Sequence, residues 1–287
     1  MIVRATDRVL VQGMTGRQGT FWTDKMIASG ANVIGGVNPK KGGSEHLGLP
    51  VFASAGEIAG GFDVAVMFIP PLGARAAALD AIAAGARLLV VLTEHIPVQD
   101  VMVVLAAARE AGTRVIGPNT AGLVTPGECF IGIMPGFNDS IFRPGRIGVV
   151  SRSGSLGTLL CLNLVRAGFG ESAFIGVGGD AILGTTSRDA LEAFEADPGT
   201  DAVVLVGEIG GTAEEDAARQ AAAMSKPVVA FVAGAAAPPG KRMGHAGAIV
   251  MGERGTYRSK RDALEGAGVT VIELPSEVGE AVRAALE

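Results

Sequence analysis

The sequence is poor in cysteine and aromatic residues, and it contains no long apolar run. Its two cysteines, Cys129 and Cys161, are too few for a disulfide framework and are not spaced as a metal-ligand pair. Apolar runs end at glycine, proline or charged residues before the roughly 20 residues that a membrane-spanning helix needs. The N-terminus also lacks the apolar core of a signal peptide. We therefore expect no membrane association and a reducing, cytoplasmic location.

Basic residues are not in excess either, because the net charge is −5. No run of lysines and arginines suggests nucleic-acid binding. A Walker A loop is missing, and no acidic pair indicates a metal site in this chain. With 287 residues the chain can form two domains with full cores, and its high mean hydropathy of +0.39 fits buried parallel strands and a subunit interface.

Short apolar runs alternate with alanine-rich helical stretches in both halves, which predicts parallel sheets covered by helices on both faces. Expected strands are 8–12, 32–37, 64–70, 87–92, 114–117, 147–151, 173–177, 202–206, 227–232 and 269–273. Expected helices are 18–29, 72–85, 98–112, 155–168, 186–196, 212–224, 257–266 and 277–286. Prolines and glycines interrupt the alternation over 121–145, which we interpret as a connector carrying some irregular structure.

The first predicted strand runs into Gly13-Met14-Thr15-Gly16-Arg17-Gln18-Gly19, a loop whose glycines allow close approach to an anion at the start of the following helix. Its G-x-x-G-x-x-G spacing differs from the usual dinucleotide fingerprint. The second strand ends at Lys40 and Lys41. An NAD site has an acidic residue at this place, which binds the ribose hydroxyls. These lysines favour a ligand with additional phosphate, either coenzyme A or NADP, unless they form only a solvated turn.

A single histidine, His245, lies among small residues in Gly-His-Ala-Gly-Ala, just after Lys241 and Arg242. An open imidazole is a good nucleophile near neutral pH, and the cations suit a group that will carry phosphate. The alternative is an ordinary surface histidine.

Two further segments contain residue types that phosphate chemistry needs. Ser153, Gly154 and Ser155 precede a predicted helix, whose free N–H groups and dipole could bind phosphate. Glu208 follows a predicted strand at the carboxyl end, where parallel-sheet proteins place their sites. A carboxylate there could fix the tautomer of His245.

Together with Gly117-Pro-Asn-Thr-Ala-Gly122, these motifs occur in an order that resembles the α subunit of succinyl-CoA synthetase and its relatives, such as malate–CoA ligase. The resemblance runs essentially from end to end. It implies an α/β chain with a Rossmann-like CoA-binding domain (1–120), the connector (121–145) and a flavodoxin-like phosphohistidine domain (146–287).

The resemblance also implies roles for individual residues. His245 would be phosphorylated and Glu208 would orient it, while Ser153, Gly154 and Ser155 would hold the phosphate. Residues expected to bind CoA are Thr15, Gly16, Arg17, Gln18, Lys41, Leu92, Thr93 and Glu94. Those expected near the acid substrate are Asn119, Thr120 and Thr158.

The implied reaction joins a carboxylic acid to CoA with conversion of ATP or GTP to the diphosphate and phosphate. The nucleotide and Mg²⁺ would be bound by a β subunit with an ATP-grasp-type site, in an αβ or larger assembly. Phosphohistidine at 245 would form an acyl phosphate, which the CoA thiol then attacks.

Several residues differ from those usual in the family, and these differences lie around the expected binding site of the acid. Thr158 and Leu159 stand where the family has tyrosine and glutamate, and Thr120-Ala121 replaces Cys-Pro. Phe130 and Pro239 each replace a usual lysine. We therefore expect an acid other than succinate, with hydroxy-, branched and sulfonated acids all open, although drift within an ordinary succinyl-CoA synthetase is the alternative.

Two other functions compete with a ligase. A non-catalytic CoA-binding or regulatory relative would have no need of His245, Glu208 and the Ser-Gly-Ser turn. A nicotinamide dehydrogenase is disfavoured by the basic end of the second strand.

Overall fold

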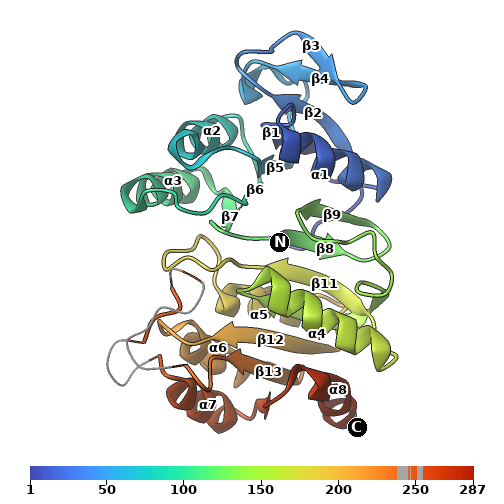
Figure 1. Ribbon diagram of the computed structural model, residues 1–287, viewed down its shortest axis with the longest axis vertical. Coiled ribbons are helices and arrows are strands. Elements are labelled where there is room, and N and C mark those ends of the chain that lie inside the picture. Colours follow the sequence, from blue (N-terminus) through green and yellow to red (C-terminus); the bar gives the residue numbers. More distant parts are fainter. Residues whose placement is uncertain (238–244, 246, 251–254) are drawn as a thin grey trace.

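The computed structural model describes residues 1–237, 245, 247–250 and 255–287, and it contains two seven-stranded sheets (Figure 1). The first sheet has the order β3-β4-β2-β1-β5-β6-β7. Its strands are β1 (Val9–Gln12), β2 (Val33–Val37), β3 (Ser44–His46), β4 (Leu49–Phe52), β5 (Val64–Met67), β6 (Leu88–Val91) and β7 (Arg114–Ile116). All neighbours are parallel except β3 and β4. Without β3, this is the 3-2-1-4-5-6 order of dinucleotide-binding folds.

Three helices cover this sheet, namely α1 (Arg17–Ala28), α2 (Pro71–Ala83) and α3 (Val98–Ala111), and a 3-10 turn, η1, spans Ala55–Glu57. Helices α2 and α3 pack against each other, whereas α1 also contacts β9 of the second sheet. The predicted strands and helices of the first half are confirmed. The short hairpin β3–β4 was not predicted, because β3 is a three-residue polar segment and β4 is a four-residue apolar segment interrupted by Pro50, so neither is long enough to show periodicity.

The second sheet has the order β14-β13-β12-β10-β11-β8-β9. Its strands are β8 (Gly122–Thr125), β9 (Cys129–Gly132), β10 (Pro144–Ser151), β11 (Glu171–Gly176), β12 (Ala202–Glu208), β13 (Val228–Ala233) and β14 (Thr270–Ile272). The strands from β10 to β14 are parallel to one another, and they follow the flavodoxin-like order 2-1-3-4-5. The expected α/β fold with two parallel sheets in series is confirmed.

Helices cover the second sheet as well. They are α4 (Gly154–Arg166), α5 (Ser187–Ala196), α6 (Ala213–Ala221), α7 (Tyr257–Gly266) and α8 (Val278–Leu286), with a 3-10 turn, η2, at Pro275–Glu277. Helix α4 packs with α8, and α6 packs with both α5 and α7. None of the helices among the described residues combines the length and apolar character needed to cross a bilayer.

The segment 121–145 is more regular than the sequence suggested. Strands β8 and β9 form an antiparallel hairpin that pairs with β11 and extends the second sheet. Gly122 and Gly132 have positive φ angles of 107° and 129°, in a place where side chains would collide with the opposite strand. Each strand has only four residues, all buried, and this short run is hard to recognise between prolines.

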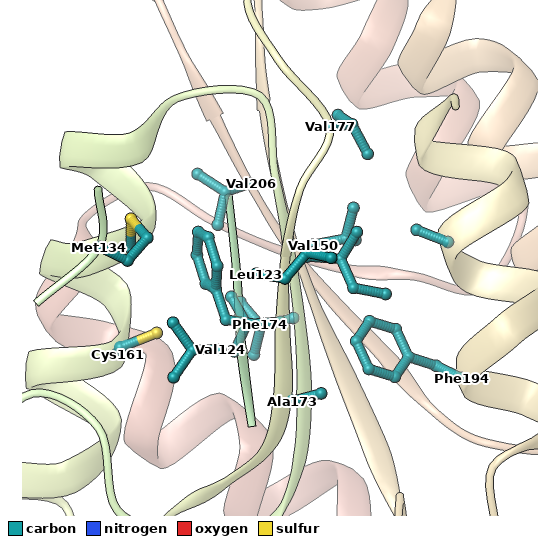
Figure 2. Close-up of a cluster of buried hydrophobic side chains, with 14 of the residues drawn as sticks. Leu123, Val124, Met134, Val150, Cys161, Ala173, Phe174, Val177, Phe194 and Val206 are labelled. Atoms are coloured by element: carbon teal, nitrogen blue, oxygen red, sulfur yellow. The ribbon is translucent and has the colours of Figure 1, made fainter. Parts of the chain in front are cut away.

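Two of the few aromatic residues, Phe174 and Phe194, fill the core of the second sheet. Phe174 lies on the α4 side, near Cys161, while Phe194 of α5 lies on the other side (Figure 2). Both rings are fully buried, and each is opposite a glycine: a Cβ at Gly148 would come within 2.6 Å of the Phe194 ring, and Gly157 makes similar room for Phe174. Glycine here allows dense packing of a sheet against large rings.

The two sheets are joined by direct contacts. The Thr125 hydroxyl donates to the Val3 carbonyl oxygen at 2.6 Å, and the Thr185 hydroxyl donates to the Val115 carbonyl oxygen at 2.6 Å. One hydrophobic core continues through β1, β5 and β6 into β8 to β13. The functional loops of the two sheets are therefore fixed relative to each other.

Candidate active site

The carboxyl ends of β10 and β12 meet at the point where the strand order of the second sheet reverses. Ser151 of β10 lies beside Val206 of β12, so the loop from Arg152 onward is next to Glu208. Helices leave such neighbouring strands toward opposite faces, which opens a crevice between them. The sequence-predicted phosphate turn and orienting glutamate are thus brought together by the topology.

His245 and Glu208 form a hydrogen-bonded pair in this crevice. The Nδ1 atom of His245 lies 2.7 Å from Oε2 of Glu208, and Nδ1–H donates to the carboxylate. The Glu208 side chain is 8% exposed and that of His245 is 29% exposed. This geometry leaves Nε2 as the ring nitrogen with a free lone pair, which is the nucleophilic form of the imidazole.

The glycine at position 179 creates the space for the imidazole. A Cβ atom there would lie 2.6 Å from Cγ of His245, well inside van der Waals contact. Gly179 is held in turn by its N–H, which donates to the Asn119 carbonyl oxygen at 3.1 Å. The loop after β11 is therefore the platform on which the ring lies.

Three charges determine the protonation of His245. The hydrogen bond to Glu208 raises the pKa of His245 above its ordinary value. Burial and the nearby Arg152 cation lower it, while Asp180 raises it. Arg152 was missed at the sequence level: its Nη2 atom lies 3.4 Å from Oε1 of Glu208, and its side chain is only 4% exposed. The sequence signal that could have identified Arg152 is its position in Ser-Arg-Ser-Gly-Ser (151–155), directly before the predicted phosphate turn.

The N-terminus of α4 begins at the same crevice. Ser153 is the N-cap, and its hydroxyl accepts a hydrogen bond from the Leu156 N–H at 3.4 Å. The hydroxyl groups of Ser153 and Ser155 lie 3.2 Å apart. No acidic side chain occupies the first turn, so the positive end of this helix is available to an anion.

The three residues expected near the acid differ in their surroundings. Asn119 is half-buried, and its side-chain amide donates to Asp180 at 3.0 Å, beside the histidine platform. The buried Thr120 hydroxyl donates to the Gly176 carbonyl oxygen and accepts from the Gly122 N–H. The half-buried Thr158 hydroxyl donates to the Gly154 carbonyl oxygen at 2.8 Å. Their roles toward a substrate stay predictions.

The glycine loop of the first sheet forms a tight turn into α1. Gly13 has a φ of +80°, and its carbonyl oxygen accepts from the Gly16 N–H at 3.1 Å. Gly16 is the N-cap of α1 and offers no side-chain cap, and Arg17 and Gln18 after it are exposed. Free N–H groups, a helix dipole and a cation thus gather at one point.

The loop after β2 contributes two further cations. The half-buried Asn38 accepts from the Lys40 N–H at 3.0 Å through its side chain and from the Lys41 N–H at 2.9 Å through its carbonyl oxygen. Its amide donates to the Thr15 hydroxyl at 2.7 Å, which ties the lysine turn to the glycine loop. The positioning role of Asn38 was missed from the sequence.

The expected contacts further along the cofactor follow β6. Leu92 and Thr93 are half-buried, and Glu94 is exposed. The Thr93 hydroxyl donates to the Ile69 carbonyl oxygen at 2.6 Å, which fixes the loops after β5 and β6 together.

A cavity of about 1080 Å³ opens beside the histidine platform. Its walls include Arg152, Asp180 and Gly247, together with the first turns of α5 and α6. The predicted cations Lys241 and Arg242, and Pro239, lie outside the described residues. Within the part of the chain that the structure describes, no group of acidic, histidine or cysteine side chains could hold a metal ion.

Comparison with known proteins agrees with this architecture. Residues 5–95 match the family model for a CoA binding domain, and residues 150–270 match that for CoA-ligase. The chain is 51% identical to a succinate–CoA ligase [ADP-forming] subunit alpha from Methanothermobacter thermautotrophicus, covering 97% of this chain and 94% of the relative. It is 42% identical to an ADP-forming sulfoacetate–CoA ligase subunit from Bilophila wadsworthia, covering 100% and 99%.

A solved structure supports the same fold. ATP citrate lyase from Methanothrix soehngenii, in complex with citrate and coenzyme A, has a TM-score of 0.86 and 26% identity over the whole of this chain. The present chain spans 50% of that longer chain. A CoA binding domain followed by a CoA-ligase domain defines a CoA ligase. The chain belongs to the family of ADP-forming acid–CoA ligase α subunits, whose members include the succinate–CoA ligases.

Proposed function

We propose that this chain, with a β subunit, joins a small carboxylic acid to CoA through a phosphohistidine at position 245, with an NTP converted to the diphosphate and phosphate. The observation that carries the proposal is the 2.7 Å contact between Nδ1 of His245 and Glu208, which directs Nε2 away from its partner. An imidazole fixed in this tautomer is a nucleophile toward phosphorus.

The first step forms a bond from Nε2 of His245 to the γ-phosphorus and breaks the bond to the leaving diphosphate. Phosphorylation makes the ring cationic, and the Glu208 carboxylate stabilises that charge. Ser153, Gly154 and Ser155 support the phosphoryl group, because the α4 terminus offers N–H groups and a positive dipole end.

In the second step a carboxylate oxygen of the acid attacks phosphorus and releases the imidazole, giving an acyl phosphate. In the third step the CoA thiol loses its proton, its sulfur attacks the acyl carbon, and phosphate leaves. Splitting the transfer in this way converts a poor acyl donor, a carboxylate, into a mixed anhydride.

CoA binds to the first sheet in this proposal. Thr15, Gly16, Arg17 and Gln18 contact its phosphates, Lys41 contacts its nucleotide end, and the loop Leu92-Thr93-Glu94 lies along the remainder. The support is the cluster of helix dipole, free N–H groups and cations around Thr15 and Asn38.

In this proposal the nucleotide and Mg²⁺ bind to a β subunit with an ATP-grasp-type site, as the similarity to α subunits of ADP-forming ligases suggests. Two buried free cysteines, Cys129 and Cys161, fit a reducing, cytoplasmic setting.

The acid is proposed to differ from succinate. One relative acts on sulfoacetate by its name, and the citrate lyase was solved with citrate, so this fold accommodates different acids. Thr158 and the 39%-exposed Leu159 stand on the first turns of α4, close to the phosphate end, where they shape the acyl pocket together with Asn119 and Thr120.

Mass spectrometry tests the proposal directly. The chain is copurified with the β chain encoded beside it, incubated with ATP–Mg²⁺ and analysed under conditions that preserve acid-labile phosphate. We expect one phosphoryl group on His245, which is lost when CoA and one acid from a panel are added together. A correctly assembled complex that remains unphosphorylated would instead indicate a non-catalytic CoA-binding relative.

A further inference from the structure

A row of buried charges runs behind the His245–Glu208 pair. Arg152 Nη1 lies 4.0 Å from Oε1 of Glu214, and the other oxygen of Glu214 pairs with the ammonium group of Lys260. The side chains of Glu214 and Lys260 are fully buried. Because an unpaired ion in such a place is costly, each charge holds its neighbour in position.

Glu214 is also bound to the backbone of the candidate active site. Its Oε1 atom accepts a hydrogen bond from the Glu208 N–H at 3.2 Å. Lys260, on α7, reaches a second carboxylate as well, with 3.3 Å to Oε2 of Glu215. The first turn of α6 therefore connects α7 to the end of β12.

We propose that Arg152 is a positioning residue of the phosphotransfer centre, which pairs with the Glu208 carboxylate, keeps it directed at His245 and is itself held by Glu214 and Lys260. This inference rests on the proposed function, since it assigns Arg152 a part in readying His245 for phosphorylation. Nothing in the described contacts gives Arg152 another partner of opposite charge: its two ion pairs are with Glu208 and Glu214.

The physical reason is a conflict between the two states of the ring. A nucleophilic imidazole is neutral, and a neutral ring leaves the carboxylate of Glu208 buried without a counter-charge. Arg152 supplies that charge from 3.4 Å. Without it, a proton would be drawn to the Glu208–His245 pair, and the ring would be a cation that cannot attack phosphorus.

The charged groups that face His245 come from three elements of the described chain. Glu208 ends β12, Arg152 follows β10, and Asp180 follows β11. Arg152 lowers the pKa of His245, whereas Glu208 and Asp180 raise it. Removal of Arg152 must therefore raise the pKa of the histidine.

The test measures the initial rate of His245 phosphorylation between pH 6 and 9, in the copurified αβ complex with ATP–Mg²⁺. Arg152→Met is expected to displace the pH profile upward by about 0.5 to 1 unit. Arg152→Lys keeps the charge but loses the planar fork, so its profile should match the wild type at a reduced rate. Arg188→Met is the matched control, because Arg188 lines the same cavity as Arg152 and, among the described residues, forms its ion pair with exposed Glu192.

A second measurement separates this inference from the proposed function. The pKa of His245 is read by ¹⁵N NMR on the full α chain, without nucleotide, for the wild type, Arg152→Met and Arg152→Lys. We expect a higher pKa for Arg152→Met and a pKa near that of the wild type for Arg152→Lys, which keeps the positive charge. A folded Arg152→Met protein with an unchanged pKa and pH profile overturns the positioning role. A wild-type complex that is never phosphorylated, with the NMR shifts present, overturns the proposed function and supports the charge arrangement.

Discussion

Asn119 and Thr93 connect the two halves of the candidate active site, because the Asn119 N–H donates to the Thr93 carbonyl oxygen at 3.0 Å. Thr93 lies in the loop after β6 of the first sheet, whereas the Asn119 side chain donates a hydrogen bond to Asp180 beside His245. Asn119 therefore contacts the proposed CoA loop through its backbone and the proposed phosphotransfer centre through its side chain. Several expected outcomes depend on this arrangement.

Glu208→Gln should lower the rate of His245 phosphorylation by about 10²-fold or more, because an amide fixes neither the tautomer nor the charge of the ring. The rate is measured in the αβ complex with ATP–Mg²⁺. Glu192→Gln changes an exposed glutamate of α5 and serves as the control. Equal rates for both variants would contradict the orienting role of Glu208.

Gly179→Ala should impair phosphorylation strongly, with little effect on the thermal midpoint. Its new methyl group would lie 2.6 Å from the present position of the imidazole, so the ring must leave its place beside Glu208. Gly56→Ala, at a position with open space, is the control. A fully active, folded Gly179→Ala protein would show that the ring works elsewhere.

Lys41→Ala should weaken CoA binding about 2- to 5-fold at low salt, since one exposed cation near a phosphate contributes up to about 1 kcal/mol. Isothermal titration of CoA at two salt concentrations measures it, and the difference from wild type should shrink as salt rises. Phosphorylation of His245 without CoA should not change. Lys25→Ala, which removes a cation from the last turn of α1, should leave CoA affinity unaltered.

Glu171→Gln should stabilise the protein at alkaline pH. Burial raises the pKa of Glu171 from 4.5 to about 8. A raised folded pKa means that the stabilising effect of the protonated carboxyl is complete below pH 4.5 and is lost as pH rises through about 8. Glutamine keeps an acceptor for the Arg143 N–H and stays neutral, so the variant should gain on the order of 2 kcal/mol over wild type at pH 9.

Denaturant unfolding at pH 6 and pH 9 measures this gain. The difference between variant and wild type should be larger at pH 9 than at pH 6, because the loss begins above pH 4.5 and is complete only above about pH 8. A difference that is the same at both values would show that Glu171 does not titrate in this range.

The sequence predicted the main strands and helices because their apolar runs alternate clearly. It could not predict the β8–β9 hairpin, since four-residue strands between prolines carry little periodicity. The association of Glu208 with His245 was inferred from the order of motifs, yet the part of Arg152 depends on where β10 and β12 end in space. The positioning role of Asn38 could not be predicted from the sequence either. It depends on two backbone N–H groups and the Thr15 hydroxyl, which only the fold brings close to Asn38.

The joint between the sheets has a further consequence for the choice of substrate. Three hydrogen bonds hold the two sheets together: Thr125 to Val3, Thr185 to Val115 and Asn119 to Thr93. The glycine loop of the first sheet and the histidine platform of the second therefore keep a fixed separation and do not move together around a short ligand. Under the proposed function, the flexible arm of CoA must be long enough to carry its thiol from the glycine loop to the phosphotransfer centre. Thiols that carry the same nucleotide on a shorter arm would be held at the glycine loop and would still fail to reach the acyl phosphate.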